Sequence, residues 1–302
     1  MFYAPHHIRL ISLFSVLFVS SLIWFSVVYP VLAPLEAAPH PAEHVFVPSV
    51  PSLLAHAFLV KFIGEDRNLA GQREDKRLAP ASLNKILTAV LALENLSPED
   101  KIIFSGESKK VEEKTSTVKT GDAVIRDDAI RLAIVGSAND SALALAEAMG
   151  YKLGGNNSSS SIEMFMNLMN RKAVEIGLLD SKFVNPTGLD APDQYITAKD
   201  LAKLAEYIWN NHRIIWEMSR VIDTTVISSN NIAYTMTNTN DLLQEFPGIR
   251  GSKTGFTDAA KENLLMLYPV YPDKTAVIVI LGSEDRVEDG RKIIQWLEEK
   301  FK

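Results

Sequence analysis

Residues 275–282 read TAVIVILG, an uninterrupted apolar run with the length of a β-strand. Because the run does not alternate with polar residues, it is typical of a central strand that is covered on both faces. Residues 248–256 and 262–269, which precede it, also read as strands. Residues 285–301 follow as a helix with an apolar stripe at helical spacing. This part of the chain therefore predicts a sheet that packs against a helix.

The chain ahead of this region contains an early strand and a series of helices. Residues 53–63 (LLAHAFLVKFI) read as a strand, and apolar periodicity predicts helices at about 82–95, 127–135, 139–149, 162–176 and 198–210. Thr197 and Asp200 suggest a capping box at the start of the last of these. Residues 220–227 and 231–237 alternate and indicate a hairpin. We predict an α+β fold in which the first and last segments share one antiparallel sheet and the middle helices form a second lobe.

A segment without charge stands near the N-terminus. Residues 10–32 are long enough, at about 1.5 Å per residue, to cross the hydrocarbon core of a bilayer as a helix. Arg9 precedes the segment and Glu36 follows it, which favours the N-terminus inside and the remainder outside the cytoplasm. A retained transmembrane anchor is favoured over a cleaved signal peptide, whose apolar region is usually about 7–15 residues. Cleavage stays open because small residues follow Glu36.

These features divide the sequence into four parts. Residues 1–9 are expected to be cytoplasmic, 10–32 to form the transmembrane anchor or signal segment, and 33–51 to form a linker rich in Pro and Ala. Residues 52–302 are expected to form one folded domain outside the cytoplasm. The chain would then be a single-pass protein of the cell membrane, or a secreted one if the leader is cleaved.

Composition excludes several classes of function. The formal net charge of −6 argues against a nucleic-acid partner, which would favour a basic face. The absence of cysteine excludes disulfides, thiolate nucleophiles and zinc sites ligated by cysteine. Four of the six histidines fall in the first 44 residues, so that only His56 and His212 remain for the folded domain. A hydrolase built from this chain would therefore need a base other than histidine.

Ser82-Leu83-Asn84-Lys85 is the first of three short elements that could carry chemistry. Positions i and i+3 of a helix lie on one face, so that the Ser82 hydroxyl and the Lys85 amine are expected side by side. A serine hydroxyl needs a base to become a nucleophile, and a lysine can serve where burial or a nearby cation lowers its pKa. Taken alone, the pattern is weak, because a capping serine followed by a surface lysine also produces it.

Ser137-Ala138-Asn139 and Lys253-Thr254-Gly255 are the other two elements. Ser137 could relay a proton between the lysine and a leaving amine, and the Asn139 amide could donate to a substrate carbonyl. A strand at 253–255 would present Lys253 and Thr254 to an anionic substrate terminus. Gly255 has no Cβ, so that a substrate backbone could approach the strand closely at this residue. The N–H of Phe256 could donate a hydrogen bond to an oxyanion. A second K-T-G, at 119–121, lies in a polar stretch and is interpreted as a turn.

In the order S-x-x-K, S-x-N, K-T-G, the three elements match the set found in penicillin-binding proteins and class A β-lactamases. Over about residues 53–300 the chain resembles the D-alanyl-D-alanine carboxypeptidases, low-molecular-mass penicillin-binding proteins of serine peptidase family S11. The resemblance includes PASLNKILTAVLALE (80–94), SANDSALALAE (137–147), FVNPTGLD (183–190) and SKTGFTDAA (252–260). The sequence departs from the usual family pattern at Asn84, Thr187, Ile196 and Lys261.

The resemblance implies a catalytic cleft between a sheet with helices and a helical lobe. It implies that Ser82 is the acylated nucleophile and Lys85 its base, and that Ser137 and Asn139 relay protons and position the substrate. It further implies that Lys253 and Thr254 bind the terminal carboxylate, and that the N–H groups of Ser82 and Phe256 form the oxyanion hole. The implied substrate is a peptidoglycan stem peptide that loses its terminal D-alanine, and β-lactams are implied as covalent inhibitors. No metal or cofactor is implied.

Three alternatives remain open at this point. An endopeptidase that cleaves cross-links of the cell wall would use the same residues. A β-lactamase would need a base for rapid deacylation, and Glu163 in EMFMN only superficially provides one, because an apolar stripe places this segment on a core helix. A catalytically silent module that binds the wall or senses penicillin is the third.

Overall fold

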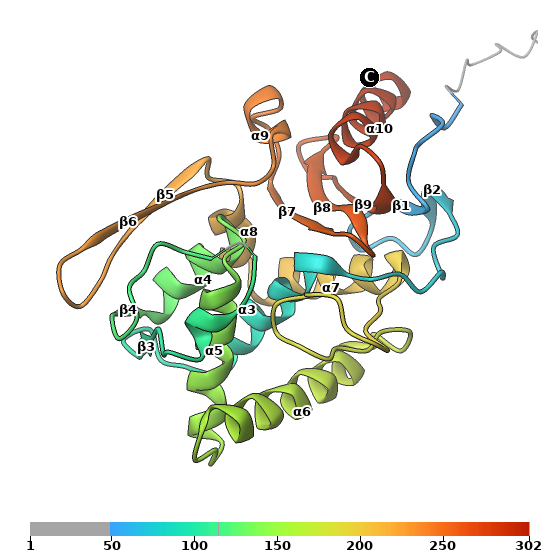
Figure 1. Cartoon of the computed structure of the whole chain (residues 1–302). Coiled ribbons are helices and arrows are strands. Elements are labelled where there is room, and N and C mark those ends of the chain that lie inside the picture. The colour runs from blue at the N-terminus through green and yellow to red at the C-terminus, as the bar shows by residue number, and fades with distance from the viewer. Residues whose placement is uncertain (1–48, 114, 302) are drawn as a thin grey trace, which may run out of the picture. The chain divides into compact units, whose positions relative to one another are not determined.

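A five-stranded antiparallel sheet forms one half of the fold in the computed structural model, which describes residues 49–113 and 115–301. The strand order is β2-β1-β9-β8-β7, and Figure 1 shows helices on both sides of the sheet. The strands are β1 (Ala57–Phe62), β2 (Asn68–Gln72), β7 (Gly251–Thr257), β8 (Lys261–Pro269) and β9 (Thr275–Ser283). The apolar run at 275–282 is thus the middle strand, as predicted, and the first and last segments share one sheet.

Alternation along β9 explains why this strand lies in the centre. Val277, Val279 and Leu281 point into the core shared with the helical lobe, whereas Ala276, Ile278 and Ile280 point into the core beneath the last helix. Fully burying one such Val or Ile side chain stabilises the fold by about 1.5–3 kcal/mol. Both faces of the strand are therefore held by the hydrophobic effect.

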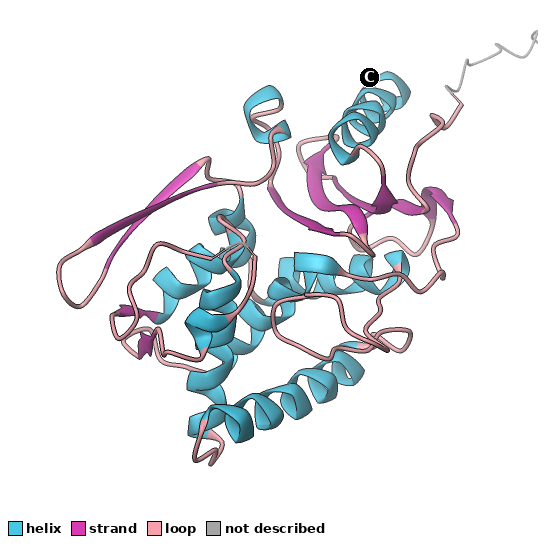
Figure 2. Ribbon diagram, in the orientation of Figure 1, coloured by secondary structure: helices cyan, strands magenta, loops and turns pink. Residues whose placement is uncertain are grey.

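The helices occupy the two faces of the sheet and a separate lobe, as Figure 2 shows. Helix α10 packs on β8 and β9, and α7 packs on β9 and β1. The helices are α3 (Asn84–Asn95), α4 (Arg126–Ile134), α5 (Asn139–Lys152), α6 (Ser158–Ile176), α7 (Ala198–Asn211), α8 (Ile214–Ser219), α9 (Leu242–Glu245) and α10 (Arg286–Phe301). Two two-stranded antiparallel sheets complete the fold, one formed by β3 (Lys101–Ile103) with β4 (Ala123–Ile125) and the other by β5 (Asp223–Ile227) with β6 (Ala233–Thr237).

Local details differ from the sequence predictions at several places, among them the start of α6, which lies at Ser158 and not at 162. The early strand begins at Ala57, four residues later than the predicted start at 53. Thr197 does cap α7, because its hydroxyl accepts from the N–H of Asp200 at 3.1 Å. The reciprocal half of the predicted capping box is missing, since the Asp200 carboxylate accepts from the Asp180 N–H and the Ser181 hydroxyl instead.

The predicted membrane segment at 10–32 lies outside the described residues, together with residues 1–9 and most of the linker at 33–51. Among residues 49–113 and 115–301, no helix combines the length and the apolar character that crossing a bilayer requires.

Candidate active site

The Ser82 hydroxyl and the Lys85 amine lie side by side at the start of α3. Lys85 Nζ is 2.7 Å from Ser82 Oγ and donates to the Thr187 carbonyl at 2.7 Å. The Lys85 side chain is fully buried, with a relative exposure of 0%. Ser82 sits in the 3-10 turn η2 (Ala81–Leu83), and Ala81 has a φ of 49°, in the left-handed region. Such a conformation costs free energy in a non-glycine residue and is common where a functional side chain must be presented.

A narrow cleft beside Ser82 brings together residues that are far apart in the sequence. All three motif elements reach it, together with the 188–189 segment and the start of α10. Its lining consists of Ser82, Glu113, Ser137, Asn139, Gly188, Leu189, Thr254, Gly255, Phe256, Thr257 and Arg286. The convergence expected from the order of the motifs is therefore present in the structure.

Ser137 and Asn139 border the cleft from the side of the helical lobe. Ser137 has a φ of 60° and its hydroxyl accepts from Lys253 Nζ at 2.8 Å. Asn139 begins α5, and its Nδ2 donates to the Glu112 carbonyl at 3.0 Å. An amide nitrogen carries two protons, so that Asn139 can hold this loop and still donate to a substrate.

Strand β7 borders the cleft from the side of the sheet. Thr254 lines the cleft, and its hydroxyl is hydrogen-bonded to that of Thr239. The sequence predicts that Lys253 faces the substrate, but the structure places it behind the lining, where its buried amine donates to Ser137 Oγ and to the Thr254 carbonyl. An anionic terminus in the cleft would therefore meet the Thr254 hydroxyl directly, with the charge of Lys253 behind it.

At Gly188 and Gly255, two other backbone segments approach the Ala81–Ser82 turn so closely that a side chain there would clash with it. A Cβ on Gly255 would lie 2.9 Å from Ala81 Cβ and 3.0 Å from Ser82 N. A Cβ on Gly188 would lie 1.7 Å from the Ala81 carbonyl oxygen, and the φ of Gly188 is 88°. The 188 segment and β7 thus press against the turn that presents the Ser82 hydroxyl.

We therefore expect Gly188→Ala to lower the free energy of unfolding by more than about 2 kcal/mol, because an alanine at positive φ costs roughly 1–2 kcal/mol before the clash is added. Gly64→Ala is the matched control, since Gly64 also has a positive φ, of 78°, but a Cβ there would meet no described atom within 4 Å. Urea unfolding compares the two variants. An equal loss in both would show that the contact with Ala81 is unimportant.

Sequence reasoning missed three residues that complete the site. Asn263, fully buried in β8, donates to the carbonyls of Ala79 and Pro80 and thereby ties the segment ahead of Ser82 to the sheet. The sequence did not single out Asn263, because it directly follows Lys261 and Glu262 at the polar start of the strand. Arg286 and Glu113 line the cleft, but nothing in their local sequence distinguishes them from ordinary surface charges.

Several other features of the described residues do not belong to this site. The second K-T-G forms a turn, with Asp122 N–H donating to the Lys119 carbonyl, as predicted. Glu163 lies on α6 and does not line the cleft. A roomier pocket of about 440 Å³ lies between β3 and α5, but no residue of the three motifs lines it. Residues 49–113 and 115–301 contain no group of three potential metal-ligating side chains.

The chain is similar to known D-alanyl-D-alanine carboxypeptidases and to a D-alanyl-D-alanine endopeptidase. The model of the Peptidase S11 family, D-alanyl-D-alanine carboxypeptidase, matches residues 45–284. A D-alanyl-D-alanine carboxypeptidase of Bacillus subtilis is 28% identical over 238 residues, which are 77% of this chain and 58% of that protein. The chain thus spans less than two thirds of the length of this relative. A D-alanyl-D-alanine endopeptidase of Pseudomonas aeruginosa is 27% identical over 87% of this chain and 83% of its own length.

The fold is also found in solved structures. The crystal structure of the Streptomyces K15 DD-transpeptidase superposes with a TM-score of 0.76 at 24% sequence identity. The match covers 83% of this chain and 99% of the transpeptidase. This likeness establishes the architecture of a sheet with a helical lobe for the described part of the chain.

Proposed function

Because the chain belongs to the D-alanyl-D-alanine carboxypeptidase family of serine peptidases, we propose that it removes the terminal D-alanine from peptidoglycan stem peptides through an acyl-enzyme on Ser82. One observation carries this proposal. The buried Lys85 amine lies 2.7 Å from the Ser82 hydroxyl, beside a cleft that Ser137, Asn139 and Thr254 also line. A nucleophile within hydrogen-bond reach of its base is what covalent catalysis requires.

Acylation begins when the neutral Lys85 amine takes the proton of the Ser82 hydroxyl while Oγ attacks the carbonyl carbon of the scissile bond. The negative charge that develops on the carbonyl oxygen is stabilised by the N–H groups of Ser82 and Phe256. The C–N bond then breaks, and Ser137, which lines the same cleft, donates its proton to the departing amine and regains one from Lys85, which becomes neutral again. Free D-alanine leaves with its carboxylate released from the Thr254 hydroxyl.

Deacylation restores the enzyme. A water molecule attacks the ester carbonyl, the C–O bond to Ser82 breaks, and the proton of the water returns to Ser82 Oγ through Lys85. A β-lactam would acylate Ser82 by the same first step, with its ring amide in place of the peptide bond. The release of D-alanine and the covalent binding of β-lactams therefore both proceed through an ester on Ser82.

The direct test uses the full chain in detergent and a monomeric pentapeptide that ends in D-Ala-D-Ala. We expect one D-alanine to be released from each pentapeptide, measured by enzymatic oxidation of the free D-alanine or by mass spectrometry. Absence of release, together with the absence of a penicillin adduct, would contradict the proposal.

One observation favours the endopeptidase alternative. The Pseudomonas aeruginosa relative is named a D-alanyl-D-alanine endopeptidase, and its match with this chain spans 83% of the relative's length. A cross-linked peptide dimer, offered in competition with the monomeric pentapeptide, separates the two activities. Faster cleavage of the dimer would assign the endopeptidase activity to this chain.

We further propose that residues 10–32 anchor the chain in the cell membrane with residues 52–302 outside the cytoplasm. The length of the uncharged segment and the position of Arg9 support this orientation. Peptidoglycan also lies on that side of the membrane. Deletion of residues 1–33 should move the protein from the membrane fraction to the soluble fraction, and protease added to spheroplasts should digest the domain. Protection from that protease would contradict the orientation.

A further inference from the structure

The loop of residues 184–189 supplies a carbonyl that holds the Lys85 amine. Lys85 Nζ donates to the Thr187 carbonyl at 2.7 Å, and Thr187 is buried. A neutral amine has two N–H groups and one lone pair, so that an N–H placed on this carbonyl leaves the lone pair for the Ser82 hydroxyl. The position of the Thr187 carbonyl therefore influences how the base meets the nucleophile.

The side chain of Gln194 closes this loop. Its Oε1 accepts from the backbone N–H groups of Val184 and Asn185 at 3.0 and 3.1 Å, where the loop begins. Its Nε2 donates to the Leu189 carbonyl at 2.8 Å, where the loop ends. By comparison, Thr88 of α3 gives the loop one hydrogen bond, at 2.9 Å. Because Gln194 is buried, the loss of its bonds would leave buried polar groups unpaired, and the amide therefore fixes both ends of the loop.

The same amide contacts the helix that carries Lys85. Asn84, the first residue of α3, donates from Nδ2 to Gln194 Oε1 at 2.9 Å and to the Asn185 carbonyl at 3.1 Å. Three N–H groups thus donate to Gln194 Oε1, while a carbonyl accepts from Nε2. These partners determine the orientation of the amide, because its oxygen only accepts and its nitrogen only donates. The loop is thereby joined to the residue directly before Lys85.

Within the loop, Asn185 connects Gln194 to Thr187. The Asn185 N–H donates to Gln194, and Asn185 Oδ1 accepts from the Thr187 hydroxyl at 2.9 Å and from the Gly188 N–H at 2.7 Å. The Thr187 carbonyl lies between these two donors along the chain. A continuous set of hydrogen bonds therefore runs from Gln194 through Asn185 and Thr187 to the Lys85 amine.

The backbone next to Gln194 is held as well. Tyr195 and Lys182 exchange backbone hydrogen bonds at 2.8 and 3.1 Å, and Ile196 and Leu78 do so at 2.9 and 3.0 Å. Gln194 thus extends its side chain from a segment that is bonded to two other parts of the chain.

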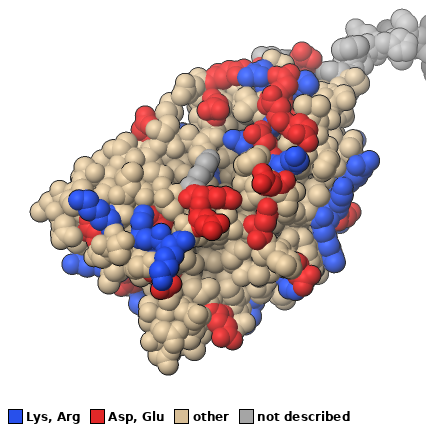
Figure 3. All heavy atoms as spheres, viewed as in Figure 1, with Lys and Arg blue, Asp and Glu red and all other residues tan. Residues whose placement is uncertain are grey.

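We infer that Gln194 is a positioning residue for Lys85, because its amide fixes the loop whose Thr187 carbonyl holds the amine at the Ser82 hydroxyl. The inference rests on the proposed function, in which Lys85 is the base. Gln194 does not line the cleft, so that it acts through Lys85 and not on the substrate. Charged side chains stand on the surface, as Figure 3 shows for one face, whereas the side chains that join the loop to α3 are neutral. A misplacement of reacting groups by about 1 Å can cost roughly 100-fold in rate.

The experiment measures the limiting rate of acylation by benzylpenicillin with the full chain in stopped flow, and circular dichroism verifies folding. Gln194→Met has a similar length but makes none of the four hydrogen bonds, and we expect it to be acylated about 10- to 100-fold more slowly. Gln194→Glu keeps an oxygen for the three N–H donors, which stabilise a carboxylate. It should stay within about threefold of the unaltered protein when each is measured at the pH of its fastest acylation. An equal loss in both variants would overturn the inference.

A double variant distinguishes positioning of the base from a general structural role. If Gln194 acts through Lys85, adding Gln194→Met to Lys85→Met should slow the residual acylation by less than about twofold, because the effects of coupled residues do not add. The mass of the intact protein, followed over hours, measures this slow reaction. A further loss of about tenfold would show that Gln194 supports the whole cleft, and would overturn the inference.

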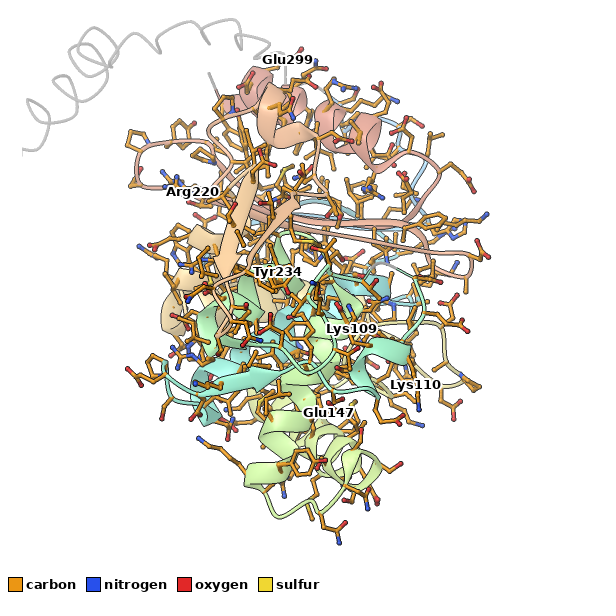
Figure 4. The ribbon with its side chains drawn as sticks, turned by 60° about the vertical axis from the view of Figure 1, so that its left-hand side comes forward. Lys109, Lys110, Glu147, Arg220, Tyr234 and Glu299 are labelled. Atoms are coloured by element: carbon orange, nitrogen blue, oxygen red, sulfur yellow. The ribbon has the colours of Figure 1, made fainter. Side chains whose placement is uncertain are left out.

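Asn170→Leu is the matched control near the loop. The Asn170 amide bonds to the Met166 carbonyl and to both backbone groups of Phe183, directly before the loop. Glu147→Leu is a distant control, because this buried side chain accepts from two serine hydroxyls and Figure 4 shows it in the helical lobe. Both variants should unfold at lower urea concentration than the unaltered protein and be acylated within about twofold of its rate.

A tenfold slower acylation in either control would overturn the inference, because the loss of any buried hydrogen bonds would then suffice. Normal acylation of folded Gln194→Met would also overturn it and would leave the proposed function intact. Failure of the proposed function would look different, since the unaltered protein itself would then form no penicillin adduct and release no D-alanine.

Discussion

Ser82→Ala should lower the rate of D-alanine release by at least about 1,000-fold, because removal of the nucleophile prevents the covalent intermediate. Ser82 is only partly buried, so that the loss of its hydroxyl leaves the core unchanged. The measurement is D-alanine release from a D-Ala-D-Ala pentapeptide, with circular dichroism to verify folding. Ser159→Ala is the control, because Ser159 is an exposed serine of α6 outside the cleft.

A folded Ser82→Ala variant that retains more than a few per cent of the activity would contradict the assignment of the nucleophile. In that case another hydroxyl of the cleft, Ser137 above all, would have to be acylated instead.

Lys85→Met should slow the acylation of Ser82 by about 100- to 10,000-fold, the range that a general base contributes. Methionine has a similar length but no amine to accept the hydroxyl proton. Lys85→Arg should fail as well, because a guanidinium stays protonated in proteins and offers no lone pair. The rate of penicillin acylation in stopped-flow experiments measures both variants without requiring turnover.

The control for these variants is Thr88→Val, which removes a buried hydrogen bond to the neighbouring Pro186 carbonyl, at 2.9 Å, without touching the nucleophile. We expect it to lower stability by about 1–3 kcal/mol, the cost of leaving a buried carbonyl unpaired, and to retain acylation. Near-normal acylation in Lys85→Arg would mean that the positive charge at this position, and not a base, is what the reaction needs.

The sequence predicted the fold well where a segment is long and its pattern unambiguous. The run at 275–282 is apolar on both faces, and the structure indeed buries Val277 and Ile278 on opposite sides of the sheet. Elements of three to six residues, such as β3, β4 and α8, are too short to show a period. The capping box failed in one half because Asp200 finds partners in a loop about 20 residues before it.

Residues of the site could be predicted where they are neighbours in the sequence or belong to motifs whose order is known from a protein family. Ser82 and Lys85 are neighbours on one turn of helix, so that their spacing alone predicts the contact. The bond between Lys253 and Ser137 joins two motifs that are 116 residues apart, and only the folded chain shows that Lys253 lies behind the cleft. Glu113 could not be singled out, because only the folded chain brings its loop to the start of α5 and to the cleft.

The most direct test of the account is the mass of the intact protein after exposure to benzylpenicillin, followed by peptide mapping. If Ser82 is the nucleophile, one adduct per chain is expected, located on the peptide that contains Ser82 and absent from Ser82→Ala. An adduct on any other residue, or an unmodified protein under conditions in which it is folded, would contradict it.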